Sequence, residues 1–240
     1  MQQLLTSDVF RQVPSDPSVS PHLRSDAVPP APTVLVVDDD DDVRGSLCDL
    51  LESVGMRAIG FSTGHELLAS DLLEGPGCLI LDVRMPGLGG LALQTRLAAS
   101  GRPKPIIFVT GHGDIPMTAQ AMKAGAVDFL TKPVRDQTLL DAVNAALLLD
   151  EKTRAQALAS KRNADLYETL TPRERQVMGA VVEGSLNKCI AFDLGISEVT
   201  VKLHRASMMR KMCAASVSHL VRAWQSLPAN VREAANAALA

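Results

Sequence analysis

The feature that most constrains the fold is an alternation of short apolar runs with helical patterns between residues 33 and 150. Glycine closes several of the helical patterns, at Gly55, Gly101 and Gly125, as is usual for helix ends. Strands that alternate with helices favour a parallel sheet covered on both faces, so we predict an α/β, flavodoxin-like (βα)5 domain with strand order 2-1-3-4-5. The expected strands are residues 33–37, 57–61, 78–81, 105–109 and 126–130, and the expected helices are 43–54, 65–70, 88–99, 115–124 and one that begins at Asp136.

Polar residues that could bind ligands or take part in a reaction follow four of these apolar runs. They are Asp38-Asp39, Asp82, Thr110 and Lys132. The carboxyl ends of the strands are where open α/β sheets hold their sites. Neighbouring carboxylates cannot all remain ionised without compensation, and a hard cation such as Mg²⁺ prefers their oxygens. Each residue alone is equally explained as turn or helix-start chemistry, but the set predicts a site in which a carboxylate accepts a phosphoryl group.

Charge divides the chain in two. The overall charge is −3, but residues 33–150 carry −7 and residues 151–240 carry +5, so only the second part is expected to meet a polyanion. We expect no membrane segment, and four scattered cysteines indicate reduced thiols in the cytoplasm. The predicted organisation is a disordered, proline-rich leader (1–32), the α/β domain (33–150), a helical or flexible linker (151–166), a small all-α domain (167–232) and a tail (233–240).

The small basic domain opens with a capping box at Thr171–Glu174 and continues with three helical patterns over residues 187–194, 197–211 and 216–227. The first two of these, joined by a tight turn at Gly195-Ile196, predict a helix-turn-helix whose second helix enters the major groove of double-stranded DNA. A solvated basic face on a helical bundle is the alternative. The residues expected to face DNA are Ser197, Thr200, Lys202, Leu203, His204 and Arg205.

Residues 33–150 resemble the receiver domain of two-component response regulators. The resemblance implies that Asp82 accepts phosphate from a sensor histidine kinase. The matching segments are Val36-Val37-Asp38-Asp39, Leu81-Asp82-Val83-Arg84-Met85-Pro86-Gly87, Val109-Thr110-Gly111-His112-Gly113-Asp114 and Asp128-Phe129-Leu130-Thr131-Lys132-Pro133.

The same resemblance implies the roles of the surrounding residues. Asp39, Asp82 and the main-chain carbonyl of Arg84 would hold Mg²⁺, and Asp38 would assist through water. Thr110 and Lys132 would bind the phosphoryl oxygens. Thr110 and Phe129 would act as a switch, which makes residues 115–129 our candidate face for dimerisation after phosphorylation.

The basic domain resembles the LuxR-type DNA-binding domain, so that the whole chain is similar to the FixJ subfamily of NarL/FixJ regulators. It departs from the family pattern at Ser185-Leu186 and at Cys189, which puts a phosphate contact near the former in doubt. The matching segments are Leu170-Thr171-Pro172-Arg173-Glu174-Arg175, Asn187-Lys188-Cys189-Ile190-Ala191 and Ile196-Ser197-Glu198-Val199-Thr200-Val201-Lys202-Leu203-His204-Arg205.

The expected function is therefore a transcription regulator, not an enzyme, that binds DNA as a homodimer when phosphorylated. A DNA-binding regulator that does not depend on phosphorylation is the main alternative. An Asp-nucleophile phosphatase is disfavoured because Arg84 stands where such enzymes carry a second Asp. A ligand-sensing regulator would need a pocket-forming domain in place of the acidic strand ends.

Overall fold

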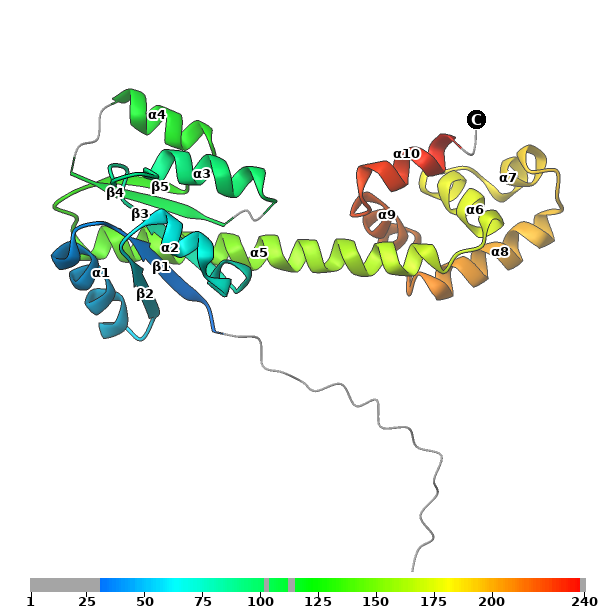
Figure 1. Cartoon of the computed structure of the whole chain (residues 1–240). Helices are drawn as coiled ribbons and strands as arrows, with labels where there is room; N and C mark the ends of the chain where they lie inside the picture. Colours follow the sequence, from blue (N-terminus) through cyan, green and yellow to red (C-terminus); the bar gives the residue numbers. More distant parts are fainter. Residues whose placement is uncertain (1–30, 102–103, 112–114, 238–240) are drawn as a thin grey trace, which may run out of the picture. The chain divides into compact units, whose positions relative to one another are not determined.

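The computed structural model describes residues 31–101, 104–111 and 115–237. Most of the predicted leader lies outside these residues. A five-stranded parallel sheet has the order β2-β1-β3-β4-β5, which confirms the predicted flavodoxin-like topology (Figure 1). Its strands are β1 (Thr33–Val37), β2 (Arg57–Phe61), β3 (Gly77–Leu81), β4 (Ile106–Thr110) and β5 (Asp128–Thr131).

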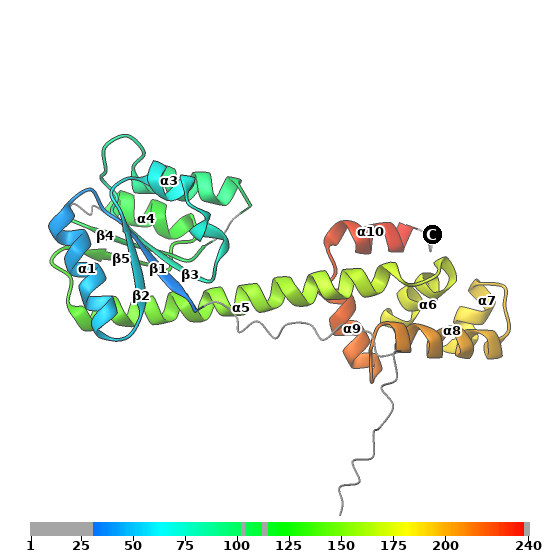
Figure 2. The same ribbon diagram turned by 60° about the horizontal axis from the view of Figure 1, so that its bottom comes forward.

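Helices cover both faces of this sheet, and β1, β3 and β4 are therefore buried along their whole length (Figures 1 and 2). Leu47 of α1 and Val143 of α5 belong to the core on one face, whereas Leu67 of α2 and Leu93 of α3 belong to the core on the other. The helices are α1 (Asp41–Ser53), α2 (Gly64–Ala69), α3 (Gly90–Ala99), α4 (Ile115–Lys123) and α5 (Asp136–Glu168), with a short 3₁₀ turn, η1 (Asp71–Glu74), that the sequence did not predict.

Helix α5 is continuous through the residues expected to form a linker (Figure 1). Its Asp150 is 4% exposed and accepts hydrogen bonds from the main-chain N–H of Gly77 (2.8 Å) and from Nε of Arg154 (2.9 Å). Gly77 has φ +139°, and a Cβ there would lie 1.9 Å from the carbonyl oxygen of Thr33. A glycine is therefore required where β3 begins, at the residue that α5 contacts.

Near its C-terminal end, α5 contributes Tyr167 to the hydrophobic core of the basic domain, which is separate from the cores on the sheet and is called the second core below. That core also holds Val201, Met208 and Trp224, and it is surrounded by short helices, as predicted for the basic domain. These are α6 (Pro172–Val182), α7 (Asn187–Asp193), α8 (Glu198–Lys211), α9 (Val217–Gln225) and α10 (Ala229–Ala237).

Helix α10 was not predicted, since the residues from 233 onward were interpreted as a tail. Val231 packs against the second core and donates its N–H to the carbonyl of Pro228 (3.0 Å), which starts the helix. Within the described ranges, no helix is both long and apolar enough to cross a membrane.

Candidate functional site

The strand register brings the predicted carboxylates to one edge of the sheet. Val37 of β1 pairs with Leu81 of β3, so Asp38 and Asp82 follow at the same level. The N–H of Asp82 donates to the carbonyl of Val37 (2.8 Å), which fixes this level just beyond the strands. Asp38 and Asp82 are 2% and 6% exposed, so both carboxylates lie largely out of water.

Lys132 joins these two carboxylates. Its Nζ lies 2.6 Å from Oδ2 of Asp38 and 3.6 Å from Oδ1 of Asp82. The main-chain N–H of Lys132 donates to the carbonyl of Thr110 (2.8 Å), which holds the end of β5 beside the end of β4. The Lys132–Pro133 peptide is cis. The ammonium therefore makes a close ion pair with Asp38 and a longer one with Asp82.

The pKa of Asp82 differs from that of an ordinary surface carboxylate. Burial raises the pKa of Asp82, and the negative charge of Asp38 adds to the rise. Lys132, the N–H of Arg84 (3.0 Å to Oδ2) and the side chain of Thr110 act in the opposite direction without cancelling it. Burial acts to lower the pKa of Lys132, but Asp38 and Asp82 outweigh burial and raise it. Lys132 is thus held as a cation, and the ionised form of Asp82 is only partly compensated.

Asp39, predicted to bind metal through its carboxylate, is exposed, as is Arg84, which was predicted to bind through its main-chain carbonyl. Among the residues that the structure describes, no three His, Cys, Asp or Glu side chains form a group that could hold a metal ion. The structure thus brings Asp38, Asp82, Thr110 and Lys132 together but does not add Asp39 to them. The oxygen donors still suit a hard cation, because a second positive charge would offset the burial of Asp82.

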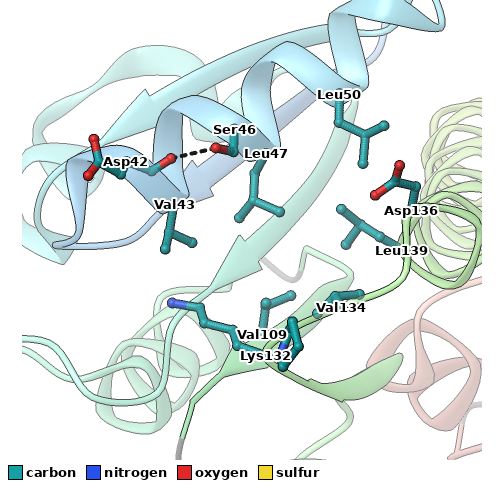
Figure 3. Close-up of a pocket in the computed structure, with 11 residues that line it drawn as sticks. Asp42, Val43, Ser46, Leu47, Leu50, Val109, Lys132, Val134, Asp136 and Leu139 are labelled. Carbon is teal, nitrogen blue, oxygen red and sulfur yellow. Dashed lines mark hydrogen bonds between the residues drawn. The ribbon is translucent and has the colours of Figure 1, made fainter.

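A pocket of about 690 Å³ opens beside Lys132, between α1 and the start of α5 (Figure 3). Val43, Leu47 and Leu139 point into it, so much of its lining is apolar (Figure 3). Asp42 and Asp136 add carboxylates to the lining. The pocket therefore offers an apolar surface with a charged margin next to the Asp38–Lys132 pair.

The predicted switch residues lie on neighbouring strands. Thr110 is 1% exposed at the end of β4, and Phe129 of β5 packs at 6.0 Å between ring centroids from Phe108. In the adjoining helix α4, Ala121 belongs to the core, whereas Ile115 is 86% exposed. The apolar residues of α4 thus divide between the core and the surface.

In the basic domain, α7 and α8 form the predicted helix-turn-helix. Gly195 has φ +62° in the turn, a conformation that favours glycine. Ser197 caps α8 by accepting a hydrogen bond from the N–H of Thr200 (3.1 Å), and Val201 and Met208 turn into the second core. The opposite side of α8 is left to solvent.

The residues predicted to face DNA differ in how far they are exposed to solvent. Lys202 and Leu203 are exposed, while Thr200 and His204 are half-buried. Arg205 is half-buried and donates from Nη1 to Oδ1 of Asn187 (2.8 Å), a contact that ties α8 to α7. Arg205 therefore has a structural partner as well as a place on the basic side of the helix.

Sequence reasoning missed two features of this domain. The first is an ion pair between Lys211 and the buried Glu174 (2.6 Å), which joins the end of α8 to the start of α6. The capping box at Thr171 signalled Glu174, but not its lysine partner. The second is Val199, which is as exposed as Leu203, at 67% each. Its position in the apolar pattern gave no means to distinguish it from a core residue.

Comparison with known proteins agrees with this geometry. Residues 34–144 match the response regulator receiver domain, and residues 168–224 match the bacterial regulatory proteins of the luxR family. The chain is 50% identical over 194 residues to nodulation protein W of Bradyrhizobium diazoefficiens, covering 81% of this chain and 86% of that protein. It is 46% identical to response regulator protein TodT of Pseudomonas putida, covering 82% and 87%.

It is also 44% identical to transcriptional regulatory protein FixJ of Azorhizobium caulinodans, covering 81% of this chain and 92% of that protein. Among solved structures, response regulator StyR matches with a TM-score of 0.70 and 45% identity, over 81% of this chain and 98% of that one. Both domains and their order are thus shared with these relatives. The chain belongs to the FixJ-type response regulators of two-component systems, which join a receiver domain to a LuxR-type DNA-binding domain.

Proposed function

We propose that Asp82 accepts a phosphoryl group from a sensor histidine kinase, and that this controls DNA binding by α8. The observation that carries the proposal is the position of Asp82. It is a buried carboxylate with a raised pKa, and its Oδ1 lies 3.6 Å from an ammonium already paired with Asp38. Such a group is more reactive than one held in a complete ion pair.

In the reaction, a carboxylate oxygen of Asp82 attacks the phosphorus of a phosphohistidine. The P–N bond breaks as the P–O bond forms, and the leaving imidazole takes a proton from solvent. Lys132 and the hydroxyl of Thr110 would bind the phosphoryl oxygens, and charge-assisted bonds of this kind are strong. The kinase would approach over the pocket beside Lys132, where apolar and acidic groups supply a contact surface.

Asp82, Asp39 and the main-chain carbonyl of Arg84 would hold Mg²⁺, with Asp38 acting through water. When bound, the ion would supply positive charge that neutralises the phosphoryl oxygens. Asp39 is exposed in the loop directly after Asp38, and its carboxylate would turn toward the ion.

The second half of the proposal concerns the output. Movement of Thr110 toward the phosphoryl group would leave space for Phe129, and the adjoining face, residues 115–129, would then support a homodimer. A dimer presents two α8 helices to paired half-sites of double-stranded DNA. The exposed Ile115 supplies apolar surface for such a contact. We place this activity in the cytoplasm, where DNA and kinase are both accessible and where free thiols such as the four here persist.

Incubation with a small phosphodonor and Mg²⁺ tests the proposal. We expect a stable adduct of one phosphoryl group by intact-mass spectrometry, and none in Asp82→Asn. Asp49→Asn, at an exposed position on α1, is the matched control and should be modified like the parent. Rapid turnover of phosphoesters, with no adduct, would instead support an Asp-nucleophile phosphatase. DNA binding that is equal with and without the adduct would support regulation independent of phosphorylation.

A further inference from the structure

Helix α8 carries apolar residues on two opposite sides. Val201 and Met208 are fully buried in the second core. Val199, Leu203 and Ala206 are exposed, and their spacing of four and three residues places them on one line along the helix. A helix with a single apolar face would be explained by its core alone. The outer line of α8 therefore needs another explanation.

The flanks of this line are polar. Lys202 is exposed on one flank, and Thr200 and His204 lie on the other. Arg210 is exposed at the end of the line, near the C-terminus of the helix. Residues 151–240 carry a net charge of +5. This arrangement fits a polyanion with two charged rims and a less charged floor, which describes the phosphates and base edges of a major groove.

The floor of the major groove presents hydrogen-bonding groups at every base pair, and its apolar group is the 5-methyl of thymine. Valine and leucine side chains over the polar edges would leave donors and acceptors without partners, which is costly. Over a thymine methyl they instead bury apolar surface. The line on α8 thus matches one base in particular.

We propose that α8 reads its half-site through thymine methyl groups, with Val199 and Leu203 as the specificity-determining side chains. Lys202 and Arg210 contact phosphates and set the position of the helix. This inference rests on the proposed DNA binding by α8 and adds the chemistry by which bases are discriminated. It assigns sequence choice to apolar contacts rather than to Lys202 or Arg205, the latter already bonded to Asn187.

The test uses the phosphorylated full-length chain and a duplex selected from a random pool. Each thymine of the selected site is replaced singly by deoxyuridine, which lacks only the 5-methyl group. We expect affinity to fall about fourfold at one or two thymines in each half-site, the effect of one buried methyl group. In Leu203→Ala or Val199→Ala, at least one of these losses should disappear while the others persist.

Phe192→Ala is the matched control, because Phe192 is an apolar side chain of the same domain that is 87% exposed on α7. It should keep the full response to deoxyuridine. Fluorescence of Trp224 in the second core checks that all three variants fold. Equal affinity for every substituted duplex would overturn the inference, as would losses unchanged in both α8 variants. A changed oligomeric state in those variants would assign the line to a protein contact and would also overturn it. A parent chain that selects no duplex would overturn the proposed function itself, and the inference with it.

Discussion

Two lysine–carboxylate pairs, one in each domain, have nearly the same geometry but different electrostatic surroundings. Lys132 lies 2.6 Å from Asp38, and Lys211 lies 2.6 Å from Glu174. The carboxylate side chains are 2% and 5% exposed, and the lysines are 23% and 31% exposed. Distance and burial alone would not tell the two pairs apart.

The difference lies in what surrounds each pair. Burial acts to raise the pKa of Glu174, but hydrogen bonds from Lys211, Thr171 and Ser207 outweigh it and lower the pKa to about 2. In the receiver domain a second carboxylate, Asp82, shares the same lysine, and its pKa is raised. A complete set of donors makes a structural contact, whereas one cation shared by two carboxylates leaves the charge of Asp82 only partly compensated, which suits the proposed phosphoacceptor.

The largest expected effect comes from making the same substitution in both pairs. Lys132→Met should slow phosphorylation of the chain by a small phosphodonor about 100-fold, the usual cost of removing one preorganised charge from a reaction site. Lys211→Met should leave this rate unchanged, because Lys211 belongs to the other domain. Stopped-flow or intact-mass time courses with Mg²⁺ measure both rates. Equal slowing in the two variants would contradict the distinction between the pairs.

For stability, we expect the larger effect from the pair in the C-terminal domain. Glu174→Gln leaves the charge of Lys211 without its partner and should lower the free energy of unfolding of the C-terminal domain by roughly 3 kcal/mol. The chain has one tryptophan, Trp224, so its fluorescence during urea unfolding follows that domain alone. Glu183→Gln, at an exposed position at the end of α6, should change the value by less than about 0.5 kcal/mol. A loss no larger than that of Glu183→Gln would mean that the pair contributes little.

The smallest expected effects concern pH, and they have opposite signs. The pKa of Glu174 falls from 4.5 to about 2 on folding, so its stabilisation is present above pH 4.5 and is lost as pH falls toward 2. The pKa of Asp82 rises above 3.8, so its ionisation destabilises the receiver domain at neutral pH, and this cost disappears as pH falls through the folded pKa.

Asp82→Asn should therefore slow hydrogen exchange in β3 at pH 7, with a difference from the parent that shrinks as the solution is made acidic. Exchange measured by mass spectrometry from pH 7 to 4, with rates corrected for the intrinsic effect of pH, gives this comparison. Faster exchange in Asp82→Asn at pH 7 would show that Asp82 stabilises the domain when ionised.

Much of the fold was predictable because parallel strands, buried on both faces, appear as continuous apolar runs. Those runs also located Asp82, Thr110 and Lys132, since Asp82 and Lys132 directly follow β3 and β5 and Thr110 is the last residue of β4. The sequence could not show that Asp38, rather than Asp39, pairs with Lys132. That choice depends on how the chain turns after β1, which the apolar pattern does not record.

Leu203 of the outer line of α8 was predicted to face DNA, but the exposure of Val199 was not predicted. Periodicity detects apolar residues on a helix, but it does not show that a particular valine near the helix start is left out of the core. Helix α10 was missed because the alanine-rich residues from 233 onward were interpreted as a tail. In both cases the missing information was a tertiary contact.

Strand β3 connects two carboxylates. Asp82 follows its last residue, and Asp150 of α5 is bonded to its first residue, Gly77. Gly77 and Asp150 are 73 residues apart in sequence but share one hydrogen bond. The path from Asp82, the proposed phosphoacceptor, to α5 is therefore one strand of five residues and that bond. A displacement of β3 along its own axis would reach α5 without passing through any loop, because the helix that continues to Glu168 is bonded to the strand that ends next to Asp82.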